Sequence, residues 1–179
     1  MKKNIVLAAI FALAMAVSAS AQKTTDFSGT WSLDVAKSKL DARMPIESQT
    51  LVVTQTATDI KFETTTKVPP PPADAPAGGG RGMRMGGADG ARTYTLDGKA
   101  VKTTEQGRMG EMTVERTAKV DGAKIMFSTT RSGQSPRGEF KISTNETWTL
   151  SSDGKTLTSE TTNESPMGTS SSTWVYTKK

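Results

Sequence analysis

Short runs of alternating apolar and polar residues recur along most of the chain and are separated by turn residues. Such period-two alternation, rich in Thr and Val, is typical of strands that bury one face. No longer stretch has helical periodicity, and 34–43 is expected to form at most one helical turn. The expected strands are 27–33, 49–55, 60–66, 92–96, 99–105, 112–120, 123–130, 139–150, 155–162 and 171–178.

Three Asp-Gly dipeptides fall between these runs, at Asp97-Gly98, Asp121-Gly122 and Asp153-Gly154. A two-residue hairpin turn of type I′ needs a positive φ at both central residues, which Gly adopts freely and Asp tolerates. We therefore expect three hairpins, each joining the two strands that flank a dipeptide.

One segment, 68–91, interrupts the strand pattern with prolines at 69–72 and glycines at 78–80 and 86–87. Prolines remove backbone donors and glycines raise the entropy cost of ordering, so this segment is predicted to be a flexible loop. Strands joined by short turns form an antiparallel up-and-down meander, and closure into a barrel removes its exposed edges. The expected fold is all-β, with a single barrel domain at 22–179 that carries this long Pro/Gly-rich loop.

The first residues have the three parts of a secretory signal. Lys2 and Lys3 are basic, 5–17 is an apolar run, and Ala19-Ser20-Ala21 supplies the small residues of a cleavage site. The apolar run is shorter than the roughly 20 residues that a membrane-spanning helix needs. We expect a signal peptide at 1–21 that is cleaved after Ala21, and a periplasmic or secreted protein without a lipid anchor.

The residue types that the chain lacks exclude several kinds of catalytic and metal site. The chain has no histidine and no cysteine, which excludes His-dependent triads, thiol nucleophiles, His-ligated zinc and disulfides. The aspartates of the Asp-Gly dipeptides are explained as turn residues, and no other acidic pair stands out. We therefore expect neither catalysis nor a cofactor.

Charge and aromatic content argue against two kinds of partner. The formal net charge is +5, but basic residues alternate with acidic ones along most segments, so no nucleic-acid surface is expected. Aromatic residues make up 6% of the chain, and Thr, Lys and Glu dominate alternate faces, unlike the apolar band and aromatic girdles of an outer-membrane barrel. The protein is therefore not expected to span a membrane.

Alternation also places a charge on an apolar face. In 112–120, Arg116 shares its face with Met112, Val114 and Ala118. A buried guanidinium needs a partner, because burying it alone is very costly. Two interpretations remain open. Arg116 meets the carboxylate of a ligand inside the barrel, or it has an ordinary place, paired with an internal carboxylate such as Glu146 or near the barrel mouth.

A few aromatic residues fall among apolar neighbours on the predicted strands. Phe62, Phe127, Trp148 and Trp174 either line a pocket or pack a small core. The first three, with Arg116, are the candidate ligand-binding residues. Met83 and Met85 carry thioethers of the kind that hold Cu(I), but no histidine or cysteine completes a site, so no metal is expected.

Residues 27–34, Phe-Ser-Gly-Thr-Trp-Ser-Leu-Asp, resemble the opening strand of calycins, the lipocalin-like β-barrels, in which Gly-x-Trp begins the barrel. Lys37-Ser38-Lys39 is similar to small exported bacterial lipocalin-like proteins, and 151–158 and 174–179 are similar to their closing hairpin and last strand. The resemblance implies a barrel of about eight to ten strands that binds a small apolar molecule. It also implies that Trp31 is structural and is covered by a basic residue of the final strand, Lys178.

Two functions follow as expectations. The first is non-catalytic binding of a small hydrophobic or amphipathic molecule inside the barrel. The alternative is a solid scaffold of the cell envelope that contacts a partner through 68–91, since long loops without secondary structure are usually functional or disordered. The pattern indicates no particular oligomeric state.

Overall fold

The computed structural model describes residues 25–41, 45–70, 90–107, 110–135 and 138–179, and these form ten strands and no helix. In 34–41, where at most one helical turn is expected, Ser38 N–H donates to the Val35 carbonyl in a short turn, at 3.3 Å. The strands are β1 (Gly29–Leu33), β2 (Ser48–Gln55), β3 (Asp59–Lys67), β4 (Gly90–Thr95), β5 (Val101–Gly107), β6 (Gly110–Asp121), β7 (Lys124–Ser135), β8 (Gly138–Leu150), β9 (Thr156–Ser165) and β10 (Gly168–Lys178).

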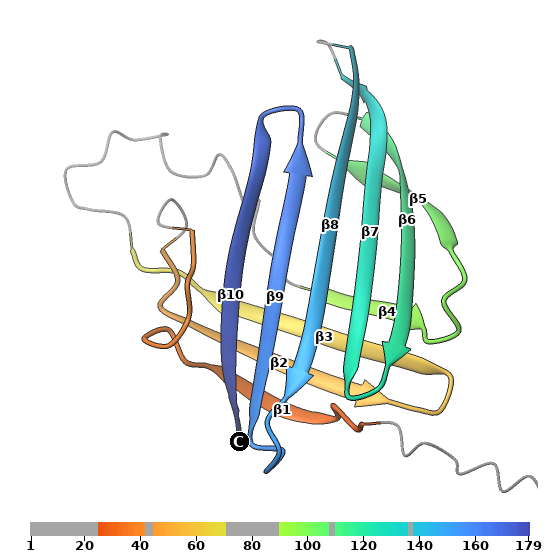
Figure 1. Cartoon of the computed structure of the whole chain (residues 1–179). Coiled ribbons are helices and arrows are strands. Elements are labelled where there is room, and N and C mark those ends of the chain that lie inside the picture. The colour runs from red at the N-terminus through yellow and green to blue at the C-terminus, as the bar shows by residue number, and fades with distance from the viewer. Residues whose placement is uncertain (1–24, 42–44, 71–89, 108–109, 136–137) are drawn as a thin grey trace, which may run out of the picture.

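All ten strands belong to one antiparallel sheet in the order β4-β3-β2-β1-β10-β9-β8-β7-β6-β5. The pairing of β1 with β10 joins the first strand to the last, and β1 to β4 cross behind β7 to β10 (Figure 1). Near one corner the segment that follows the edge strand β4 contacts β6, the neighbour of the other edge strand, where Asp97 bridges Lys119 and Gly98 N–H donates to the Ala118 carbonyl at 3.0 Å. The expected all-β, up-and-down barrel is thus confirmed, and it is nearly closed.

Two of the three expected Asp-Gly hairpins are confirmed. β6 pairs with β7 across Gly122 and Ala123, since Asp121 pairs with Lys124, and β8 pairs with β9 across the turn that contains Asp153-Gly154. The expected type I′ geometry is wrong, because no described residue other than glycine has a positive φ. The hairpin expected at Asp97-Gly98 is wrong, because β4 pairs with β3 and β5 pairs with β6. Asp97 instead accepts a hydrogen bond from Lys99 N–H at 3.0 Å, in a turn that carries the chain from one edge of the sheet to the other.

Inward-facing residues near the β6–β7 and β8–β9 turns form a packed core. Trp31, Ile60, Ile125 and Leu157 are completely buried there. The signal peptide at 1–21 and most of the Pro/Gly-rich segment, 71–89, lie outside the described residues.

The core predicts which substitutions destabilise the fold. Trp31→Ala removes a completely buried side chain and is expected to lower the free energy of unfolding by about 3–5 kcal/mol. Val52→Ala, at an outward-facing position that is 44% exposed, is the control and is expected to change it by less than about 0.5 kcal/mol. Urea denaturation of both variants measures the difference, and equal effects would contradict this assignment of the core.

The β8–β9 turn predicts a dependence of stability on pH. Asp153 accepts hydrogen bonds from the Ser151 hydroxyl at 2.5 Å and from Lys155 N–H at 3.0 Å. These bonds lower the pKa of Asp153 below its ordinary value of 3.8. A lowered pKa in the folded state stabilises the fold above pH 3.8, and this contribution is lost as pH falls below that value.

Asp153→Asn therefore is expected to lower the urea midpoint at neutral pH, and the gap from wild type is expected to shrink as the solution is acidified below pH 3.8. A gap that stays constant across this range would contradict the hydrogen-bonded role of the carboxylate.

Candidate functional site

Trp31 is completely buried where the first strand pairs with the last. Its indole Nε1–H donates to the Phe27 carbonyl at 3.0 Å, and Lys178 Nζ lies 5.1 Å from the centroid of its ring. Lys178 also pairs with Trp31 in the β1–β10 register. Gly29 is at a φ of 140°, and a Cβ there would stand 2.8 Å from Lys178 Cε. Only glycine therefore both adopts this backbone and leaves room for the lysine over the ring.

The three candidate aromatic residues come together in the same hydrophobic core as Trp31. Phe62, Phe127 and Trp148 are 3%, 3% and 1% exposed. The Trp148 ring centroid lies 5.0 Å from that of Phe62 and 4.9 Å from that of Phe127, in tilted and edge-on arrangements that favour aromatic contact. These rings, together with Tyr94 and Phe27, fill the half of the barrel nearest the C-terminus, and we call this group of five residues the aromatic floor.

Arg116 faces the interior, as alternation predicts, but its partner is not Glu146. Its Nη2 lies 2.5 Å from Glu105 Oε1, and its Nη1 donates to the Thr103 hydroxyl at 3.1 Å. Both partners are on β5, which neighbours β6, whereas Glu146 lies on β8, two strands away. Among the described residues, Arg116 Nε is the one buried side-chain nitrogen or oxygen without a hydrogen-bond partner.

Two more arginines face inward beside Arg116. Arg131 lies on the same side of β7 as Phe127, and Arg92 pairs with Phe62 in register, its guanidinium carbon 5.8 Å from the Phe62 ring centroid. Burial lowers the pKa of Arg131, and the charges of Arg92 and Arg116 lower it further. No carboxylate of the described residues forms an ion pair with Arg131.

Sequence reasoning missed Arg92 and Arg131. The sequence nevertheless indicates that Arg131 faces inward, because the alternation that begins at Phe127 and Thr129 reaches Arg131, one residue past the predicted end of that strand. Arg92 is likewise separated from the buried Tyr94 by one residue.

Above the aromatic floor, the inward-facing side chains become polar and partly exposed. Thr144, Thr161 and Asn163 are half-buried, and Ser170, paired with Asn163 in register, is exposed. Because these residues face the interior, their exposure shows that solvent enters this half of the barrel. We call it the open end, and it lies toward the β7–β8 and β9–β10 turns, away from the C-terminus (Figure 1).

Buried polar groups of the wall are paired with one another. Tyr176 O–H donates to Gln49 Oε1 at 2.6 Å, and Gln49 Nε2–H donates to the Thr66 hydroxyl at 2.8 Å. Burial raises the pKa of Tyr176 far above its usual value, so its hydroxyl stays protonated. The hydroxyls of Tyr94 and Thr129 lie 2.9 Å apart. These hydrogen bonds pair the buried polar groups of the barrel wall, and none of them involves Arg92, Arg116 or Arg131.

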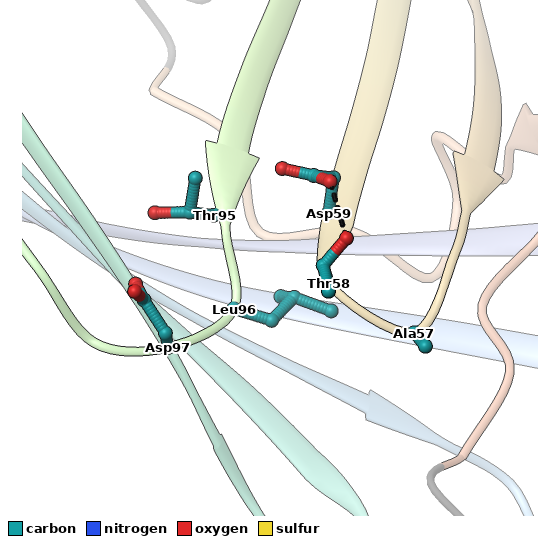
Figure 2. Close-up of a pocket in the computed structure, with 6 residues that line it drawn as sticks. All are labelled: Ala57, Thr58, Asp59, Thr95, Leu96 and Asp97. Carbon is teal, nitrogen blue, oxygen red and sulfur yellow. Dashed lines mark hydrogen bonds between the residues drawn. The ribbon is translucent and has the colours of Figure 1, made fainter.

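Two shallow hollows lie elsewhere on the molecule. One, of about 220 Å³, is lined by residues of the β2–β3 turn and the end of β4, with Leu96 between Asp97 and Thr58 (Figure 2). Its carboxylates are engaged, Asp97 with Lys99 and Asp59 with the Thr58 hydroxyl. The other, of about 290 Å³, is lined by residues of β6, β7 and β8 that include Lys119 and Met126. Within the described ranges no cluster of three potential metal ligands occurs.

No protein-family model matches the chain, and a search of curated proteins finds no match either. In the described part of the chain, no helix is long and apolar enough to cross a membrane. The protein is therefore classed by its architecture, an antiparallel, nearly closed ten-stranded β-barrel that is compatible with a lipocalin-like fold.

Proposed function

We propose that this protein is an exported, non-catalytic, lipocalin-like binder of a small amphipathic molecule that carries one acidic group. The observation that carries the proposal is Arg131, an inward-facing guanidinium above the aromatic floor that forms no ion pair with a carboxylate of the described residues, although the charge of Glu105 acts on it from a distance. A guanidinium removed from water gains most from a charged acceptor, and it binds a carboxylate with two parallel hydrogen bonds.

The local charges favour a single acidic group. Glu105 neutralises the charge of Arg116 through their ion pair. The charged form of Arg131, in contrast, is disfavoured by burial and by the charges of its basic neighbours. An anion placed at Arg131 would relieve that destabilisation, and it would also lie within the field of Arg116.

Apolar residues flank the same position. In register, Arg131 stands between Val114 on β6, which is completely buried, and Ile142 on β8, which is half-buried. The aromatic floor lies below. The interior around Arg131 therefore fits a molecule with an acid at one end and an apolar body better than it fits a purely apolar or a purely polar ligand.

The absence of histidine and cysteine supports a role without catalysis. The alternative, a scaffold that contacts a partner through 68–91, depends on a segment that lies largely outside the described residues, and no described contact favours it.

The acid site predicts the behaviour of Arg131→Met. Isothermal titration calorimetry of the purified protein with decanoic acid and with decanol is expected to show about tenfold tighter binding of the acid, and the variant is expected to lose this preference. Because the substitution removes a partly buried cation beside two others, the free energy of unfolding is expected to stay the same or rise.

Lys141→Met, an exposed and outward-facing cation on β8, is the matched control for the loss of one positive charge. It is expected to leave the preference intact. Equal affinity of the wild type for acid and alcohol would contradict the proposal, as would loss of the preference in the control.

Export is the second part of the proposal and is supported by the basic, apolar and small-residue sequence of 1–21. Expression in a Gram-negative host is expected to give a periplasmic protein whose intact mass corresponds to a chain that begins at Gln22. A cytoplasmic protein that retains Met1 to Ala21 would contradict it.

A further inference from the structure

Glu146 is the second charged group at the boundary between the aromatic floor and the open end. It faces the interior, paired in register with Phe127, and its Oε1 accepts hydrogen bonds from Trp148 Nε1–H at 2.5 Å and from the Ser159 hydroxyl at 2.7 Å. Both donors are buried. The carboxylate is therefore held in one orientation by the floor itself.

The other oxygen of Glu146 has a different environment. No described residue donates a hydrogen bond to Oε2. Among the described residues, the one buried side-chain nitrogen or oxygen that lacks a hydrogen-bond partner is Arg116 Nε, so Oε2 is not buried. Glu146 as a whole is half-buried. Oε2 is therefore reached by solvent, and the inward orientation of the side chain means that the solvent lies inside the barrel.

Glu146 and Arg131 lie at different depths of the same interior. On β8, Ile142 pairs with Arg131, and Glu146 is two inward positions closer to the floor. At about 3.3 Å per residue, the two levels are separated by about 13 Å along the strand. A ligand with its acid at Arg131 and its body directed toward the floor would thus bring its far end toward Glu146 Oε2.

We propose that Glu146 determines specificity by accepting a hydrogen bond from the far end of the ligand, which therefore carries a donor such as a hydroxyl group opposite its acid. This inference rests on the proposed function and names the ligand class, a hydroxylated or similarly donor-bearing medium-chain acid. A carboxylate oxygen only accepts hydrogen bonds, so it favours a hydroxyl over an ether, and an unpaired carboxylate beside an apolar end is costly.

The experiment compares three acids that differ at the far end, decanoic acid and its ω-hydroxy and ω-methoxy derivatives, by isothermal titration calorimetry of the purified protein. The wild type is expected to bind the hydroxy acid about tenfold more tightly than the methoxy acid, because a hydrogen bond to a charged acceptor contributes about 1.5–3 kcal/mol. The methoxy acid has an acceptor but no donor at this end.

Glu146→Gln is the informative variant. Its amide oxygen keeps the hydrogen bonds from Trp148 and Ser159, while its amide nitrogen replaces Oε2 with a donor, to which both the hydroxyl and the methoxy oxygen can bind. The preference for hydroxy over methoxy is expected to fall to about unity, with the fold retained. Asn145→Asp, which changes an exposed, outward-facing neighbour, is the control and is expected to keep the wild-type preference.

The outcomes separate this inference from the proposed function. Binding of all three acids without a hydroxy preference in the wild type would overturn the inference while the acid site stands. A hydroxy preference that survives in Glu146→Gln would overturn the assignment to Glu146. If none of the acids binds, the acid site fails and the inference fails with it.

Discussion

The packing of Lys178 over Trp31 is the interaction on which the rest of the structure depends. It joins the last strand to the first, β10 to β1, and this pairing turns a meander of hairpins into a barrel. Gly29 accommodates this approach, because a side chain there would strain the backbone at a φ of 140° and would displace the end of Lys178. Trp31 is completely buried and belongs to the same hydrophobic core as the residues of the aromatic floor, so this end of the barrel is filled.

The packed core at one end leaves only the other end of the barrel for the proposed ligand. On β7 and β8 the inward positions keep strict alternation, but their chemistry changes along the strand, from Ile125 and Phe127 to Thr129 and Arg131, and from Trp148 to Glu146 and Thr144. The apolar half supplies the stability of the fold, since it buries the large side chains. The polar half holds charges that a packed core would not tolerate, so the proposed binding site and the packed core occupy different parts of the same strands.

Alternation and turn chemistry were sufficient to predict most of the strands, two hairpins and the inward orientation of Arg116. They failed where the result depends on which strands become neighbours. Asp97-Gly98 is the same dipeptide as Asp121-Gly122 at the true hairpin, but the pairing of β4 with β3 leaves β4 at the opposite edge of the sheet from β5. The partner of Arg116 was missed for the same reason, since Glu105 is adjacent only once β5 is placed beside β6.

Native mass spectrometry of the protein, isolated from its own host without detergent, would show directly whether the open end binds one small acid. A reproducible adduct of a single small acidic molecule, lost on denaturation, is expected. A bare protein mass that persists even when medium-chain acids are added in excess would contradict this expectation.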